Sequence, residues 1–170
     1  MNKEVPMEDI ISIITEKLES GGTVTFTPKG KSMLPLLRDG EDVVVLNKPN
    51  GRLHLFDMPL YKRNNGVYVL HRIVDFDADG SYVMCGDNQF ELEHGIRDES
   101  IVAVVTAFYR KGKSYSVNSP SYRLYVNFWY YTRLFRRAYR ASKNRTSRLL
   151  GKGIKKKDEK KSNAERKEDM

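Results

Sequence analysis

Residues 67–87 read VYVLHRIVDFDADGSYVMCGD, and this stretch carries the pattern that decides the fold. Two runs rich in β-branched and aromatic residues, 67–76 and 81–87, flank the turn-forming sequence DADG at 77–80. Such an arrangement predicts two short strands joined by a tight turn. The NNG sequence at 64–66 is a further hairpin signal directly before them. The centre of the chain is therefore predicted to consist of short strands and tight turns.

Strand patterns continue on both sides of this segment. Before it, TVTFTP at 23–28 and DVVVLN at 42–47 read as strands, and 54–63 reads as a third, in which Pro59 favours an edge position or a bulge. After it, 100–117 reads as two strands around the turn RKGK. We therefore predict a mainly β domain over 23–118, a barrel or sandwich of antiparallel or mixed strands.

Two helical segments and a tail are predicted outside the β domain. Residues 1–22 contain a short helix over 6–19, where apolar residues recur at helical spacing before the SGG that ends it. Residues 119–150 form a basic, aromatic amphipathic segment with a helix over 121–140. The side chains that 100° per residue places on one side of this helix are Leu124, Phe128, Tyr131, Phe135 and Tyr139, with the arginines on the other. The charged, low-complexity segment 151–170 is expected to be disordered.

The positive charge of the chain is concentrated at its C-terminal end. The net charge is +8 over 170 residues, but residues 121–170 carry 16 Lys and Arg against 5 Asp and Glu, a net of +11. This asymmetry predicts that the C-terminal segment is an arm that binds an anionic partner. Aromatic residues beside arginines in 121–150 favour an anionic membrane surface, whereas packing of the aromatic side on the β domain is an equally good alternative. Nucleic acid ranks lower, because nothing else in the chain supports it.

The sequence also limits the location and the chemistry of the protein. The single cysteine, Cys85, excludes an internal disulfide and a cysteine-based zinc site, and we expect neither a metal nor a cofactor. The N-terminus lacks the pattern of a signal peptide, and no window offers about 20 uncharged apolar residues, the length of a transmembrane helix. We expect a cytoplasmic location, with peripheral attachment to a membrane as the alternative that the basic arm suggests.

A candidate nucleophile lies in the loop sequence GKSMLP at 30–35, just before a predicted strand. Gly30 permits a tight backbone there, and a loop entering a strand presents the Ser32 hydroxyl and nearby backbone N–H groups at a cleft. Such N–H groups, at Gly30 and Met33, could bind an oxyanion. A serine is a weak nucleophile unless a base removes its proton, and taken alone this serine is more typical of an ordinary turn than of a nucleophile.

Three histidines are available as the base. His71 lies in the predicted strand 67–76, where a rigid backbone and an ordinary pKa of about 6.5 suit proton transfer near neutral pH. Taken in isolation, His71 is more typical of a structural histidine with a satisfied hydrogen bond. His54 and His94 lie in polar, turn-like segments typical of the surface.

Carboxylates that could orient His71 follow the strand at 81–87. Asp87 belongs to a Gly-Asp-Asn sequence at 86–88, which is also an ordinary turn signal, and Glu91 and Glu93 come shortly after it. An acid bonded to His Nδ1 would select the tautomer and stabilise the imidazolium.

The order of these motifs resembles the signal peptidase I and LexA-like superfamily of serine peptidases. GxSMxP followed by RDGEDVVV, then VLHRIV, then GDN, cover about residues 23–107. The resemblance implies a β-rich catalytic fold with Ser32 as nucleophile. His71 stands where most bacterial members have a lysine, and this resembles the endoplasmic-reticulum and archaeal type, in which His71 would be the base. Asp87 matches the acid of the motif, and Glu93 or Glu91 would supply a further acid.

The resemblance predicts a serine endopeptidase that cleaves a leader or signal-type peptide within a peptide or protein substrate. The substrate would bind in extended form beside the serine. Bacterial relatives have a serine at the position of Gly30, so the backbone would have to hold the oxyanion here. The alternative is a non-catalytic module of the same fold that binds peptides or anchors at a membrane surface.

Overall fold

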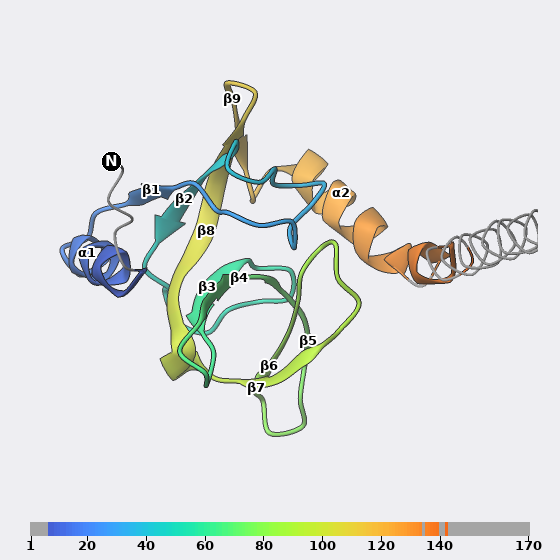
Figure 1. Ribbon diagram of the computed structural model, residues 1–170, viewed down its shortest axis with the longest axis horizontal. Helices are drawn as coiled ribbons and strands as arrows, with labels where there is room; N and C mark the ends of the chain where they lie inside the picture. Colours follow the sequence, from blue (N-terminus) through green and yellow to red (C-terminus); the bar gives the residue numbers. More distant parts are fainter. Residues whose placement is uncertain (1–6, 134, 140–141, 143–170) are drawn as a thin grey trace, which may run out of the picture. The chain divides into compact units, whose positions relative to one another are not determined.

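The computed structural model describes residues 7–133, 135–139 and 142 (Figure 1). The chain divides into two compact units, one ending at Tyr130 and one beginning at Tyr131. The first unit is mainly β, with antiparallel sheets and a short N-terminal helix, as predicted. The predicted tail at 151–170 and the end of the amphipathic segment lie outside the described residues.

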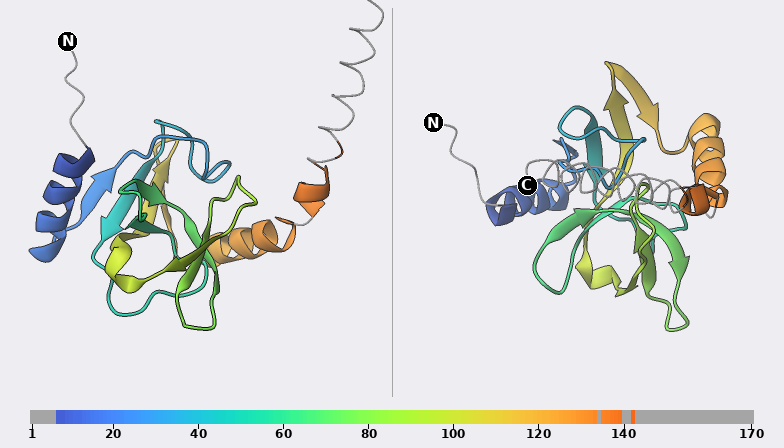
Figure 2. Two further views of the ribbon diagram at one scale, coloured as in Figure 1. Left: turned by 60° about the horizontal axis from the view of Figure 1, so that its bottom comes forward. Right: turned by 45° about the vertical axis from the view of Figure 1, so that its right-hand side comes forward.

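The first unit opens with the helix α1 (Met7–Glu19), which is followed by two antiparallel sheets (Figure 2). In the larger sheet the order is β1-β2-β8-β3-β4, with β9 also paired to β8. Its strands are β1 (Val24–Phe26), β2 (Val43–Asn47), β3 (Pro59–Lys62), β4 (Tyr68–Leu70), β8 (Ile101–Arg110) and β9 (Lys113–Ser116). The smaller sheet has the order β5-β6-β7, formed by β5 (Arg72–Phe76), β6 (Tyr82–Cys85) and β7 (Glu93–Ile96).

The core lies between α1 and the larger sheet. Ile11, Ile14 and Leu18 are buried at helical spacing, so one face of α1 covers apolar side chains of the sheet. From the long strand β8, Ala103 and Val105 point into the same core. Met33, Leu36 and Leu37, from the loop between β1 and β2, are buried in the same core.

The predicted strand 67–76 is in fact two strands that belong to different sheets. Leu70 pairs with Leu60 in the larger sheet, whereas Arg72 pairs with Cys85 in the smaller one. His71 is the single residue between them, and its side chain is almost fully buried. The expectation that His71 sits inside a strand is therefore wrong, because the chain crosses between the sheets at this residue.

Pro59 is the first residue of β3, and β3 lies inside the larger sheet between β8 and β4. An edge position was therefore the wrong expectation. The expected bulge is present, since the register of β3 against β8 shifts between Leu60 and Tyr61. A proline is tolerated as the first residue of a strand because its missing N–H interrupts the ladder least at that point.

The helix α2 (Pro120–Tyr131) accounts for the first part of the predicted helix over 121–140. Its start follows common rules, with proline in the first turn and the Ser119 hydroxyl accepting a hydrogen bond from Tyr122 N at 3.3 Å. In the second unit, residues 135–139 are also helical. Within the part of the chain that the structure describes, no helix has the length and apolar character needed to cross a membrane.

Candidate functional site

Ser32 lies, half-buried, in the turn-rich loop that joins β1 to β2. Asn88, from the Gly-Asp-Asn turn after β6, holds this loop: Asn88 N donates to Ser32 O at 2.7 Å, and Asn88 Nδ2 donates to Lys31 O at 3.1 Å. At Gly86 the approach is so close that a Cβ would lie 2.8 Å from Ser32 O and 3.1 Å from Ser32 Cβ. The first and the third sequence motif therefore form one structural unit.

A second set of bonds braces the same loop. The Arg38 backbone N–H donates to Asp42 Oδ2 at 2.8 Å, and the Arg38 guanidinium also pairs with this fully buried carboxylate. Burial alone would raise the pKa of Asp42, but the bonds from Arg38 outweigh burial and hold that pKa below its usual value. Gly30, with φ of +108°, donates its N–H to Asp39 Oδ1 at 2.7 Å. The Gly30 amide is thus used inside the loop, which argues against its expected role as an oxyanion donor.

His71 is held by a carboxylate from a different strand. Its Nδ1 lies 3.0 Å from Glu93 Oε1, and Glu93 is the first residue of β7. The Tyr61 hydroxyl donates to Glu93 Oε2 at 2.9 Å and lies 3.3 Å from His71 Nδ1. Arg63 forms a two-pronged pair with the same carboxylate, with Nε at 2.7 Å from Oε2. Of the two acids that the sequence left open as the further acid, Glu93 contacts the imidazole, while the Glu91 side chain is exposed.

The environment favours a neutral imidazole at neutral pH. Burial lowers the pKa of His71 below its ordinary value of 6.5 and outweighs the opposing attraction of Glu93. Burial alone would raise the pKa of Glu93, but the hydrogen bonds from Arg63 and Tyr61 outweigh burial and lower the pKa of this carboxyl. A neutral His71 that donates from Nδ1 to an ionised Glu93 keeps Nε2 as a proton acceptor.

Ser32 and His71 line the same cavity, which has a volume of about 260 Å³. Gly30, Met33 and Arg63 also line it, together with all three residues of β4. The cavity therefore brings the loop of the first motif and the histidine of the second motif together. The Ser32 hydroxyl forms no hydrogen bond with His71 or with any other described residue.

Asp87, the acid of the third motif, has both carboxylate oxygens bonded to Arg72. Arg72 Nε and Nη2 each donate at 2.7 Å, and both side chains are buried. Arg72 Nη1 also donates to Tyr122 Oη at 2.8 Å, and Trp129 Nε1 donates to Asp87 O at 2.9 Å. The pair therefore joins the residue after His71 to the Gly-Asp-Asn turn and to α2. This is a supporting arrangement around the crossing point, rather than a direct part of the cavity.

Sequence reasoning missed Tyr61, Arg63 and the strand β7. Tyr61 and Arg63 are two apart on one extended segment, so their side chains project from the same face toward Glu93. The available signal was local: Tyr61 and Arg63 directly precede the hairpin turn NNG at 64–66. The strand β7 has no alternating apolar pattern, and its weak signal explains why it was missed.

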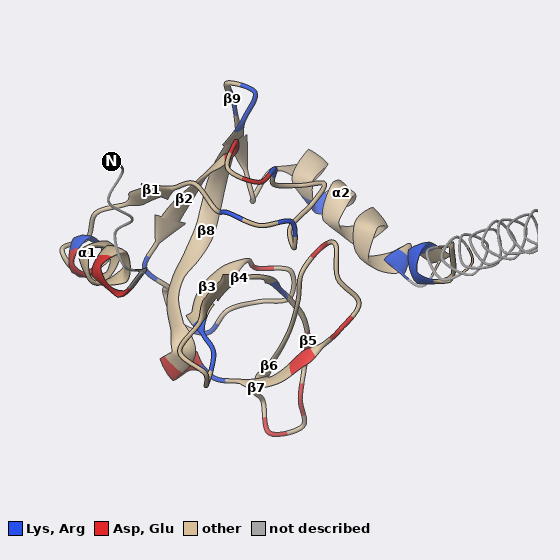
Figure 3. Cartoon of the chain, in the orientation of Figure 1, with Lys and Arg blue, Asp and Glu red and all other residues tan. Residues whose placement is uncertain are grey.

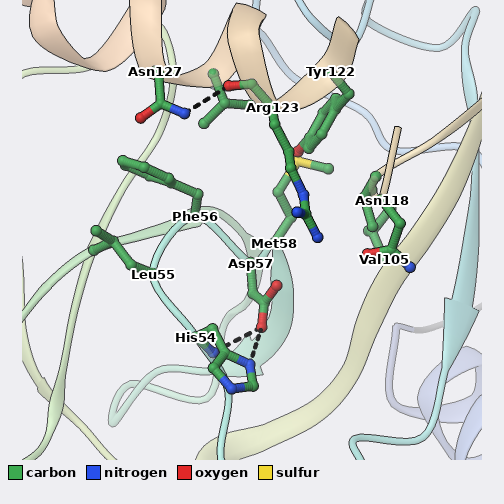
Figure 4. A pocket seen from close by; sticks show the side chains of 12 residues that line it. His54, Leu55, Phe56, Asp57, Met58, Val105, Asn118, Tyr122, Arg123 and Asn127 are labelled. Carbon is green, nitrogen blue, oxygen red and sulfur yellow. Dashed lines mark hydrogen bonds and ion pairs between the residues drawn. The ribbon is translucent and has the colours of Figure 1, made fainter. Parts of the chain in front are cut away.

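A larger cavity, about 340 Å³, lies between α2 and residues 54–58 (Figure 4). Asp57 accepts a hydrogen bond from His54 N at 2.8 Å, and the side chains of Arg123 and Asn127 extend into the cavity from α2. None of the sequence-predicted site residues lines it.

Comparisons with protein-family models, with curated proteins and with solved structures found no match for this chain. In the described ranges, no cluster of three or more His, Cys, Asp or Glu side chains could hold a metal ion.

Proposed function

We propose that this protein is a serine endopeptidase similar to signal peptidases, with Ser32 as nucleophile, His71 as general base and Glu93 as the residue that orients the base. One observation carries the proposal: Ser32 and His71 line one cavity, and a carboxylate holds Nδ1 of the histidine. A serine, a neutral imidazole and an orienting acid are the groups that acyl transfer requires. The absence of a Ser–His hydrogen bond is compatible with the proposal, because such bonds are often long without substrate.

The chemistry follows from this arrangement. Ser32 Oγ attacks the peptide carbonyl while its proton passes to His71 Nε2, and Glu93 stabilises the imidazolium that forms. His71 then gives the proton to the leaving amine, and the C–N bond breaks to leave an acyl-enzyme. His71 then takes a proton from a water molecule, whose oxygen attacks the ester carbonyl; the ester C–O bond breaks, and His71 returns the proton to Ser32 Oγ. The N–H groups of Ser32 and Met33, which have no acceptor among the described residues, are the candidate oxyanion donors.

The strand β4 supports a peptide as substrate. It stands at the end of the larger sheet, so its outer edge has no strand partner among the described residues. Tyr68, Val69 and Leu70 line the cavity that contains Ser32. An extended peptide that pairs with this edge would pass its carbonyl groups through the cavity. A leader or signal-type segment, which is extended and accessible, fits this geometry, and a barrel-like signal-peptidase fold is our interpretation of the two sheets.

A second candidate is a peptide-binding module of the same fold without catalysis. The specific observation in its favour is that Arg63 occupies the Glu93 carboxylate while the Ser32 hydroxyl has no hydrogen bond in the described structure. Such a module would use the β4 edge in the same way but leave the peptide intact.

The deciding experiment is cleavage of a diverse peptide mixture, followed by mass spectrometry. The test variants are Ser32→Ala and His71→Ala. The matched controls are Ser12→Ala, an exposed serine on α1, and His54→Ala, whose side chain is 88% exposed. We expect products from the wild type and both controls and none from the test variants. Products that persist in Ser32→Ala would refute the peptidase, and peptide capture without cleavage by the wild type would favour the binding module.

A further inference from the structure

The helix α2 has two opposite faces, and one of them is anchored to the β domain. Tyr122 and Val126 are buried on this face, and Trp129 donates to Asp87 O at 2.9 Å. Tyr122 also accepts the hydrogen bond from the buried Arg72. At 100° per residue these three side chains fall within about 60° of one another around the helix. The orientation of α2 is therefore determined by its contacts with the domain.

The opposite face of α2 presents large apolar side chains to solvent. Leu124 and Phe128 are 73% and 66% exposed. Their spacing of four residues places them on one stripe, roughly opposite the anchored face. The sequence alone left open whether this stripe packs on the β domain, and the exposure of these residues argues against that alternative. In the second unit, Phe135 and Tyr139 are likewise 78% and 71% exposed.

The charge of this region selects among partners. Residues 120–142 contain five arginines and neither Asp nor Glu, and on α2 itself basic but no acidic residues are seen (Figure 3). The wider segment 121–170 has a net charge of +11. A second copy of the chain would bring like charge against like charge, which opposes self-association. A partner must instead accept apolar and aromatic side chains while carrying negative charge.

An anionic lipid bilayer meets both requirements. Its interfacial layer accommodates Phe, Tyr and Leu side chains, and each basic residue close to an anionic surface contributes about 1 kcal/mol. We propose that α2 docks on an anionic membrane surface through the stripe Leu124 and Phe128, and so holds the β domain at the membrane. The proposal is independent of the peptidase assignment, because neither Ser32 nor His71 takes part in it.

The test is co-sedimentation of the full chain with vesicles of phosphatidylcholine, either alone or with about one-third phosphatidylglycerol. The test variant is Leu124→Gln/Phe128→Gln, and the matched control is Ile13→Gln, which removes an equally exposed apolar side chain (64%) from α1. Circular dichroism verifies that each variant is folded, which is expected because the substituted side chains face solvent.

We expect the wild type and the Ile13 variant to bind anionic vesicles. The double variant should bind them at least roughly tenfold more weakly. High salt should also weaken binding of the wild type. Equal binding by the double variant would overturn the proposal, as would equally strong binding to neutral vesicles. The proposal would also be overturned if the wild type did not bind vesicles and the double variant instead lost a dimer that the wild type forms. Loss of binding to a single-stranded oligonucleotide, again without vesicle binding by the wild type, would overturn it in the same way.

Discussion

His71 Nδ1 lies 3.0 Å from Glu93 Oε1, and this contact joins the point where the chain crosses between the two sheets to the first residue of β7. The same carboxylate is shared with Tyr61 and Arg63. One ionised group therefore orients the histidine and favours the tautomer with the proton on Nδ1, whereas burial outweighs its attraction and lowers the pKa of the ring.

Glu93→Gln should abolish most of the hydrolysis. The amide cannot stabilise an imidazolium at Nδ1, so we expect kcat to fall by about 10²–10⁴-fold with little change in KM. Glu93→Asp should retain part of the activity, because it keeps the charge. Steady-state kinetics on the best peptide from the cleavage experiment measure both values, and a Glu93→Gln enzyme with unchanged kcat would contradict the role of Glu93.

The acid limb of the pH profile should lie below pH 6.5. Because burial lowers the pKa of His71 from 6.5, the ring stays neutral, and the base stays competent, at pH values where an exposed histidine is already protonated. Activity is thus present above this limb and lost as the pH falls through the lowered pKa. The pH dependence of kcat/KM measures the position of this limb. An acid limb at or above pH 7 would disprove the assignment of His71 as the base.

Arg63→Gln should move that limb to higher pH. Arg63 lowers the pKa of His71 through its charge, whereas Glu93 raises it. Removing the arginine therefore makes the ring easier to protonate, and Glu93→Gln should shift any residual limb in the opposite direction. NMR titration of the histidine ring provides a readout that needs no substrate, and shifts of the same sign in both variants would contradict the argument.

Asp87→Asn should lower stability rather than change the chemistry selectively. It leaves the buried Arg72 without its carboxylate partner, and breaking a buried pair in this way costs about 3–5 kcal/mol of unfolding free energy. Glu99→Gln, an exposed acid, is the control and should change stability by less than about 0.5 kcal/mol. Urea unfolding measures both, and a fully stable Asp87→Asn protein would contradict the supporting role of this pair.

Gly86→Ala should displace the Ser32 loop. The added Cβ would lie 2.8 Å from Ser32 O, and backbone must move to relieve the overlap, which costs about 1–3 kcal/mol. We expect the peptidase activity to fall with it. Gly95→Ala serves as the comparison, because its Cβ would meet no atom within 4 Å and only its φ of +73° is strained. If both variants kept the same activity, the packing of the two motifs would not matter for the site.

Local patterns in the chain were enough to predict α1, the hairpin strands β8 and β9, and a mainly β domain. These features depend on residues close in sequence: apolar positions at helical spacing in α1, and Gly-containing turns between β-branched runs. The same local signals marked Ser32 and His71, since a serine in a Gly/Pro loop and a histidine among apolar residues are visible without knowing what lies across the sheet.

Long-range pairing decided the rest. The break at His71 arises because Leu70 pairs with β3 across one hairpin while Arg72 pairs with β6 across the next, and neither turn signal indicates that the two hairpins belong to different sheets. Pairing of β7 with β6 carries Glu93 to the histidine, whereas Asp87 meets Arg72. Burial then lowers the pKa of His71, and the anchoring of Tyr122 and Val126 leaves Leu124 and Phe128 exposed. Desolvation and packing of this kind exist only once distant segments have met, which is why composition and periodicity could not reveal them.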